Sequence, residues 1–133
     1  MNIQPEDIAK AGTELAHQKA IFCWAALNYH IYPELKYMYH IPNGGFRNLK
    51  EAANLKAAGV KAGVPDIHLP LPNRSHAGLF IELKRPDSVG KKAGKASKEQ
   101  DEWKEYLIRV GYLCIVCYGW QDAVKVLKEY LER

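Results

Sequence analysis

The sequence predicts an α/β domain in which a small mixed β-sheet is flanked by α-helices. Segments with apolar residues at helical spacing alternate along the chain with short apolar runs of strand length, and turn residues separate them. The chain has 133 residues, of which 47% are hydrophobic, and this is the size of one domain. We therefore expect a single domain over residues 1–133.

The N-terminal part of the chain predicts one long helix. This helix would begin at Pro5, which is acceptable in a first turn, and end at about Tyr29. Its expected buried stripe consists of apolar residues at helical spacing: Ala11, Leu15, Phe22 and Ala26.

A strand and a second helix are expected next. The strand covers Lys36–Ile41 and runs into the turn sequence Pro42–Gly45. The helix covers Asn48–Ala58 and ends at Gly59. Gly59 and Gly63 would then let the backbone before the next strand approach a ligand closely.

The centre of the chain predicts a β-hairpin. Two short apolar runs, Ile67–Leu71 and Leu79–Leu83, are separated by proline, asparagine and glycine residues. We expect Leu69 to pair with Leu79, which fixes the register of the two strands.

The last three elements are a helix, a strand and a helix. Ser97 begins a helix that runs to about Val110, and Gly111 ends it. The remaining segments are a strand over Tyr112–Tyr118 and a helix over Gln121–Leu131.

The hairpin register brings two carboxylates together. Asp66 would lie opposite Glu82, with Cβ atoms roughly 5 Å apart. Such a pair repels unless a divalent cation lies between its members, and carboxylate oxygens suit Mg²⁺ or Mn²⁺. Lys84 shares the face of Glu82, whereas Ile81 and Leu83 point to a core. This is the pattern of a metal-dependent nuclease, in which the lysine would orient or help deprotonate the attacking water.

Positive charge is concentrated directly after this motif. The chain has a net charge of +4, but the segment 84–98 alone has a net charge of +5. Such a run is a solvated loop in many proteins; beside an acidic metal motif, contact with phosphates is favoured. Its basic residues are Lys84, Arg85, Lys91, Lys92, Lys95 and Lys98.

Two other patterns carry less weight. Cys114 and Cys117 have a spacing that zinc sites use, but positions three apart on a strand face opposite ways and no second ligand pair accompanies them. The segment Gly90–Lys95 has three residues between its glycines, where a phosphate-binding loop has four. We therefore expect neither zinc nor a nucleotide cofactor.

The location expected for the protein is cytoplasmic. No apolar run approaches the roughly 20 residues that span a bilayer, and the first residues lack a signal-peptide pattern. The odd number of cysteines also argues against a disulfide framework.

Taken in order, these motifs resemble the virus-type replication-repair nuclease (VRR-NUC) domain of the PD-(D/E)xK nuclease superfamily. The resemblance covers nearly the whole chain. It implies a restriction-endonuclease-like fold and a small DNA nuclease of replication, repair or recombination. It also implies a homodimer acting on branched DNA, as Holliday-junction resolvases do. The matching elements are Glu14, Gln18, His40–Gly45, Gly63–Asp66, Ile81–Lys84, Ser97, Gln100 and Gly111–Tyr112.

The resemblance also implies roles for single residues. Glu14 would be a supplementary metal ligand, directly or through water, and the Leu83 backbone carbonyl a further ligand beside Asp66 and Glu82. Gln100 would join the catalytic group, although Ser97 and Gln100 equally fit a helix capping box. Residues expected to contact DNA are Gln18, His40, Asn43, Arg85, Lys91, Lys92, Lys95 and Lys98. A non-catalytic DNA-binding or scaffold module of the same fold is the alternative.

Overall fold

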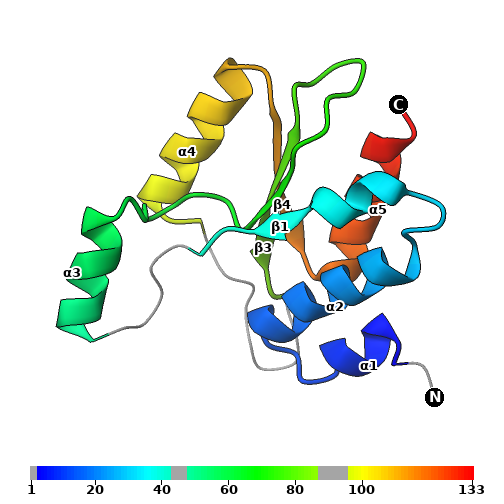
Figure 1. The fold of residues 1–133 in the computed structure, drawn as a ribbon, viewed down its shortest axis with the longest axis horizontal. Coiled ribbons are helices and arrows are strands. Elements are labelled where there is room, and N and C mark those ends of the chain that lie inside the picture. Colours follow the sequence, from blue (N-terminus) through cyan, green and yellow to red (C-terminus); the bar gives the residue numbers. More distant parts are fainter. Residues whose placement is uncertain (1–2, 43–47, 87–95) are drawn as a thin grey trace.

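The fold is a four-stranded mixed β-sheet with helices on both faces, seen in a computed structural model that describes residues 3–42, 48–86 and 96–133 (Figure 1). The sheet order is β1-β2-β3-β4. The strands are β1 (Tyr39–His40), β2 (Ile67–Leu69), β3 (Leu79–Lys84) and β4 (Leu113–Tyr118). The helices are α1 (Pro5–Ala9), α2 (Glu14–Leu27), the 3₁₀-helix η1 (Pro33–Tyr37), α3 (Leu49–Ala57), α4 (Lys98–Arg109) and α5 (Trp120–Leu131).

The strand pairing confirms the predicted hairpin register. β2 and β3 are antiparallel, and Leu69 pairs with Leu79. β1 is antiparallel to β2, whereas β3 is parallel to β4 because α4 forms the crossover between them. The sheet is therefore mixed, as expected.

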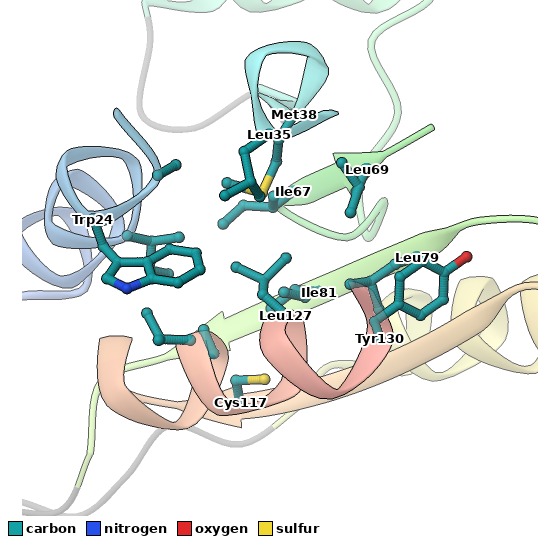
Figure 2. Close-up of a cluster of buried hydrophobic side chains, with 14 of the residues drawn as sticks. Trp24, Leu35, Met38, Ile67, Leu69, Leu79, Ile81, Cys117, Leu127 and Tyr130 are labelled. Carbon is teal, nitrogen blue, oxygen red and sulfur yellow. The ribbon is translucent and has the colours of Figure 1, made fainter. Parts of the chain in front are cut away.

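The main core lies between the sheet and the helices α2 and α5. Ile81 and Leu83 of β3 are completely buried there, and Figure 2 shows Ile81 beside Leu127 of α5. On the opposite face, Phe80 packs against Leu107 of α4 in a second, smaller cluster. Alternate residues of β3 therefore pack on opposite faces of the sheet.

The two C-terminal cysteines are divided between these faces, as the strand geometry predicts. Cys117 belongs to the main core and Cys114 to the cluster beneath α4. Both thiols are free and buried. The two side chains therefore do not form a zinc-binding pair.

The predicted long N-terminal helix is wrong in one respect, because the chain forms two helices. α1 ends before Gly12, whose φ of 73° lies in the left-handed region. Thr13 then caps α2, and its hydroxyl accepts a hydrogen bond from the Ala16 N–H at 3.0 Å. A glycine followed by a capping threonine ends one helix and begins the next.

The buried face of α2 also differs from the predicted stripe. Leu15 is 58% exposed, whereas Ile21 is completely buried. Phe22 of the predicted stripe is half-buried and packs against the main core, so the prediction is right at this position. Because α2 is apolar on most of its circumference, spacing alone does not identify the packed face. The side chains that face the core are Ala16, Ala20, Ile21, Trp24 and Ala25.

The strand predicted over Lys36–Ile41 is reduced to Tyr39 and His40, because the preceding residues form η1. Pro33 occupies the first turn of this helix, where its fixed φ is favourable. Leu35 and Met38 are both buried, and residues three apart eclipse in a 3₁₀-helix.

The helix predicted over Asn48–Ala58 is confirmed as α3, with these two residues as its caps. It has no buried residue and lies apart from the sheet (Figure 1). No helix in the described part of the chain combines the length and the apolar character needed to cross a membrane.

Candidate functional site

The side chain and the backbone carbonyl of Asp66 both accept hydrogen bonds from backbone N–H groups. It directly precedes β2 and is 4% exposed. Its Oδ2 accepts a hydrogen bond from the Leu83 N–H at 2.7 Å. Its carbonyl accepts from the Ile41 N–H at 2.7 Å and contacts Nδ1 of His40 at 2.8 Å. Because a carbonyl only accepts, this Nδ1 carries the ring proton.

Glu82 lies on the α4 side of β3, opposite the main core. It is 4% exposed, and its Oε1 accepts a hydrogen bond from Nε2 of Gln100 at 2.7 Å. The second oxygen, Oε2, is buried and has no hydrogen-bond partner among the described residues. Burial and the nearby charge of Asp66 raise the pKa of Glu82 to about 9, against the opposing effect of Lys84.

Lys84 is buried beside this carboxylate. Its Nζ donates a hydrogen bond to Oε1 of Gln100 at 3.0 Å and lies 3.8 Å from Oε1 of Glu82. Burying an ammonium group is costly unless it is paired, so these two neighbours fix its position. The site therefore has the carboxyl group of Glu82 beside the Lys84 side chain, with one glutamine touching both.

Gln100 takes part in a capping box and also contacts the charged residues of β3. It completes the predicted capping box, because its Oε1 accepts from the Ser97 N–H at 2.8 Å and its own N–H donates to the Ser97 hydroxyl at 3.2 Å. The same side chain reaches Glu82 and Lys84. The first turn of α4 thus joins the two charged groups of β3.

Glu14, the first residue of α2, lies near the acidic pair without completing a ligand set. Burial and the charge of Asp66 raise its pKa, while the charges of Lys84 and Arg85 oppose the shift. In residues 3–42, 48–86 and 96–133, no three side chains of His, Cys, Asp or Glu come together closely enough to surround a metal ion. The acidic side chains that interact most strongly here are Asp66 and Glu82, with Glu14 nearby.

This pair fits a divalent metal ion. Mg²⁺ keeps several water ligands and is commonly bound through only one or two carboxylates. The unpartnered Oε2 of Glu82 is an oxygen donor that an ion would satisfy. Two buried carboxylates also repel each other, and a bound cation removes that repulsion.

The residues predicted to contact DNA have different positions. Gln18 is half-buried on α2, one turn beyond Glu14, and Lys98 is exposed at the start of α4. Arg85 is half-buried directly after β3. Asn43, Lys91, Lys92 and Lys95 lie outside the described residues.

Gly59 and Gly63 differ in the space that is available for a side chain. A Cβ on Gly59 would meet no atom within 4 Å, so its backbone faces open space. A Cβ on Gly63 would lie only 2.6 Å from the backbone carbon of Glu99. The close approach expected of Gly63 is therefore made to α4.

An aromatic group beside Asp66 was not assigned a role from the sequence. His68 stacks on Phe80, with ring centroids 4.1 Å apart and planes 2° apart. The Tyr39 hydroxyl lies 2.7 Å from Nδ1 of His68. The hairpin register, which pairs His68 with Phe80, was the signal that could have found it.

Comparisons with known proteins identify the family of the chain. The family model of the VRR-NUC domain matches residues 12–121. A solved structure titled "VRR_NUC domain protein" is 28% identical to this chain, with a TM-score of 0.73. The alignment covers 90% of this chain and 88% of that chain. The comparison with curated proteins found no match.

Proposed function

Because the chain belongs to the VRR-NUC domain family of nucleases, we propose that it is a Mg²⁺- or Mn²⁺-dependent endonuclease that hydrolyses the phosphodiester bonds of DNA. The observation that carries this proposal is the buried pair Asp66 and Glu82, with Lys84 in contact with Glu82. Residues 1–133 would act as one nuclease domain.

The metal ion would be held by the carboxylates of Asp66 and Glu82 and by the Leu83 backbone carbonyl. Glu14 would add a ligand directly or through water, since its charge already interacts with Asp66. When bound, the ion would neutralise charge on the scissile phosphate and lower the pKa of a water molecule.

The remaining residues would orient the reactants. Lys84 would orient the attacking water or help deprotonate it, and would stabilise the negative charge that develops on the phosphate. Gln100 would fix both Lys84 and Glu82, because it bonds to each of them. Fixing such groups before the reaction is a large part of nuclease-type catalysis.

DNA would reach this site across a basic surface. Arg85 directly follows Lys84 and would contact a phosphate next to the scissile one. The segment 84–98 has a net charge of +5, which suits a polyanion. The other proposed contacts are Gln18, His40, Asn43, Lys91, Lys92, Lys95 and Lys98. We further propose a homodimer and a preference for branched DNA, on the resemblance to Holliday-junction resolvases.

The proposed location is the cytoplasm. Cys23, Cys114 and Cys117 are all free thiols in the structure. Free thiols of this kind are usual where the environment is reducing.

The test is cleavage of labelled four-way junction, flap, duplex and single-stranded DNA. Each substrate is incubated with Mg²⁺, Mn²⁺ or EDTA, and wild type is compared with Lys84→Ala. Metal-dependent cuts that are lost in the variant would support the nuclease, and the preferred substrate would identify its role. Absence of cutting together with metal-independent retention in a gel shift would support a non-catalytic DNA-binding module instead.

A further inference from the structure

Gly63 joins the segment before Asp66 to the first turn of α4. A Cβ at Gly63 would lie 2.6 Å from both the backbone carbon and the Cβ of Glu99, and 2.7 Å from its carbonyl oxygen. Two of these three atoms belong to the backbone, so a side-chain rotation cannot relieve the contact. The two segments therefore touch where only a glycine fits.

The neighbour of Glu99 is Gln100, which links this contact to the site. Nonbonded carbon atoms are in favourable contact at about 3.5–4.0 Å, so an added methyl group at Gly63 would displace the first turn of α4 by roughly 1 Å. The hydrogen bond from Gln100 to Glu82 is 2.7 Å long, and the one from Lys84 is 3.0 Å long. A displacement of this size would take both beyond the range of a hydrogen bond.

We propose that Gly63 is a positioning residue of the site. Because Gly63 has no side chain, the first turn of α4 packs directly against the backbone that precedes Asp66. This packing holds Gln100 at hydrogen-bonding distance from Glu82 and Lys84. The catalytic consequence of this inference rests on the proposed nuclease function, whereas the placement of Gln100 does not.

The chain supplies a matched control for this glycine. Gly59 and Gly63 both have a positive φ, at 106° and 87° respectively, so alanine strains the backbone at either position. A Cβ at Gly59 nevertheless meets nothing within 4 Å. Any effect of Gly63→Ala beyond that of Gly59→Ala therefore comes from the contact with α4.

The first experiment compares the steady-state cleavage kinetics of the two variants with Mn²⁺. We expect kcat of Gly63→Ala to fall by about 10- to 100-fold, no more than the loss expected for Gln100→Ala and within the scale of a misplacement of roughly 1 Å. KM should change less than kcat, because Lys98 is exposed and the proposed DNA contacts Gln18, His40 and Arg85 lie on other segments. Gly59→Ala should keep kcat close to that of wild type. Equal kcat values in the two variants would overturn the proposal.

The second experiment repeats Gly63→Ala in a Gln100→Ala background. If Gly63 acts through Gln100, the double variant should have nearly the kcat of Gln100→Ala alone. Losses that multiply would show that Gly63 acts by another route and would overturn the proposal. A Gly63→Ala protein that fails to fold while Gly59→Ala folds would also overturn it, since the residue would then support the whole fold.

A readout without catalysis separates this proposal from the nuclease itself. The side-chain amide of Gln100 gives its own NMR signals, which are identified by their loss in Gln100→Ala. These signals should shift in Gly63→Ala and stay in place in Gly59→Ala. If wild type cleaves no DNA but the signals behave in this way, the proposed function fails and the positioning role stands. Signals unchanged in Gly63→Ala would overturn the positioning role.

Discussion

Nε2 of Gln100 donates a 2.7 Å hydrogen bond to Oε1 of Glu82, so the carboxylate proposed to hold the metal ion is fixed from a helix. The glutamine is itself fixed by the capping box that begins α4, through the backbone and hydroxyl of Ser97. The capping box at the N-terminus of α4 is thereby linked by hydrogen bonds to the proposed metal ligand Glu82.

The capping role of Gln100 and its proposed role in the site can be separated by mutation. Ser97→Ala should lower the free energy of unfolding by about 1 kcal/mol, the usual cost of a lost cap. It should leave cleavage nearly intact, because the backbone N–H of residue 97 still donates to the glutamine. Gln100→Ala should lower the cleavage rate by about 10- to 100-fold, the range that one charge-assisted hydrogen bond represents. Urea unfolding and cleavage kinetics measure the two effects, and an equal loss of rate in both variants would contradict this assignment.

Removal of the acidic pair or the lysine should abolish cleavage and spare DNA binding. Asp66→Asn keeps an oxygen that can accept from the Leu83 N–H, so the fold is retained while the negative charge is lost. Lys84→Ala removes the only cation placed against Glu82 in the described part of the chain. Each variant should lose at least about 100-fold in rate.

Lys98→Ala is the matched control for Lys84→Ala, because Lys98 is exposed at the start of α4. It should weaken DNA binding slightly and leave the rate on bound DNA unchanged. Cleavage assays and gel shifts on the same substrates measure both quantities. Full activity in either Asp66→Asn or Lys84→Ala would exclude the proposed mechanism.

Glu82 should make the metal-free protein less stable at higher pH. Its pKa is about 9 in the folded chain and about 4.3 when unfolded. The folded state therefore holds a proton that the unfolded state has lost, and stability falls as pH rises between these two values. The raised pKa of Glu14 acts in the same direction. The midpoint of thermal unfolding in EDTA should accordingly decrease from pH 7 to about pH 8.5.

Glu82→Gln is the control for this pH dependence, because glutamine has nearly the same shape and does not ionise. The decrease should be smaller in this variant and also in wild type with Mn²⁺, since the ion binds the ionised carboxylate. The chosen range lies above the titration of His17 and His68, whose pKa values are lowered by burial. Identical pH profiles for wild type and Glu82→Gln in EDTA would refute the raised pKa.

The sequence predicted the parts of the site that depend on local geometry. Strand alternation and the pairing of Leu69 with Leu79 placed Glu82 and Lys84 on one face, because the period of a strand leaves two choices only. The capping box of Ser97 and Gln100 was equally visible, since its residues are close in sequence.

Contacts between distant segments were not predictable in the same way. Which face of α2 is buried depends on how α5 and the sheet pack against it, because small apolar residues occur on several sides of this helix. The contact of Gly63 with Glu99 joins a loop to a helix 36 positions further along the chain, and a glycine in sequence shows only that space is limited or φ is unusual. Mutations at two positions of α2 distinguish its packed face from its exposed face.

Ile21→Ala and Leu15→Ala provide that test within one helix. Ile21 is completely buried and contributes to the main core, so its truncation should lower the free energy of unfolding by about 2–5 kcal/mol. Leu15 is 58% exposed, and alanine is a good helix former, so Leu15→Ala should change this free energy by less than about 0.5 kcal/mol. Urea unfolding followed by circular dichroism measures both values. A larger loss of unfolding free energy for Leu15→Ala than for Ile21→Ala would show that α2 packs through the stripe expected from spacing. The helix would then be rotated, and Glu14 at its first position would face away from the site.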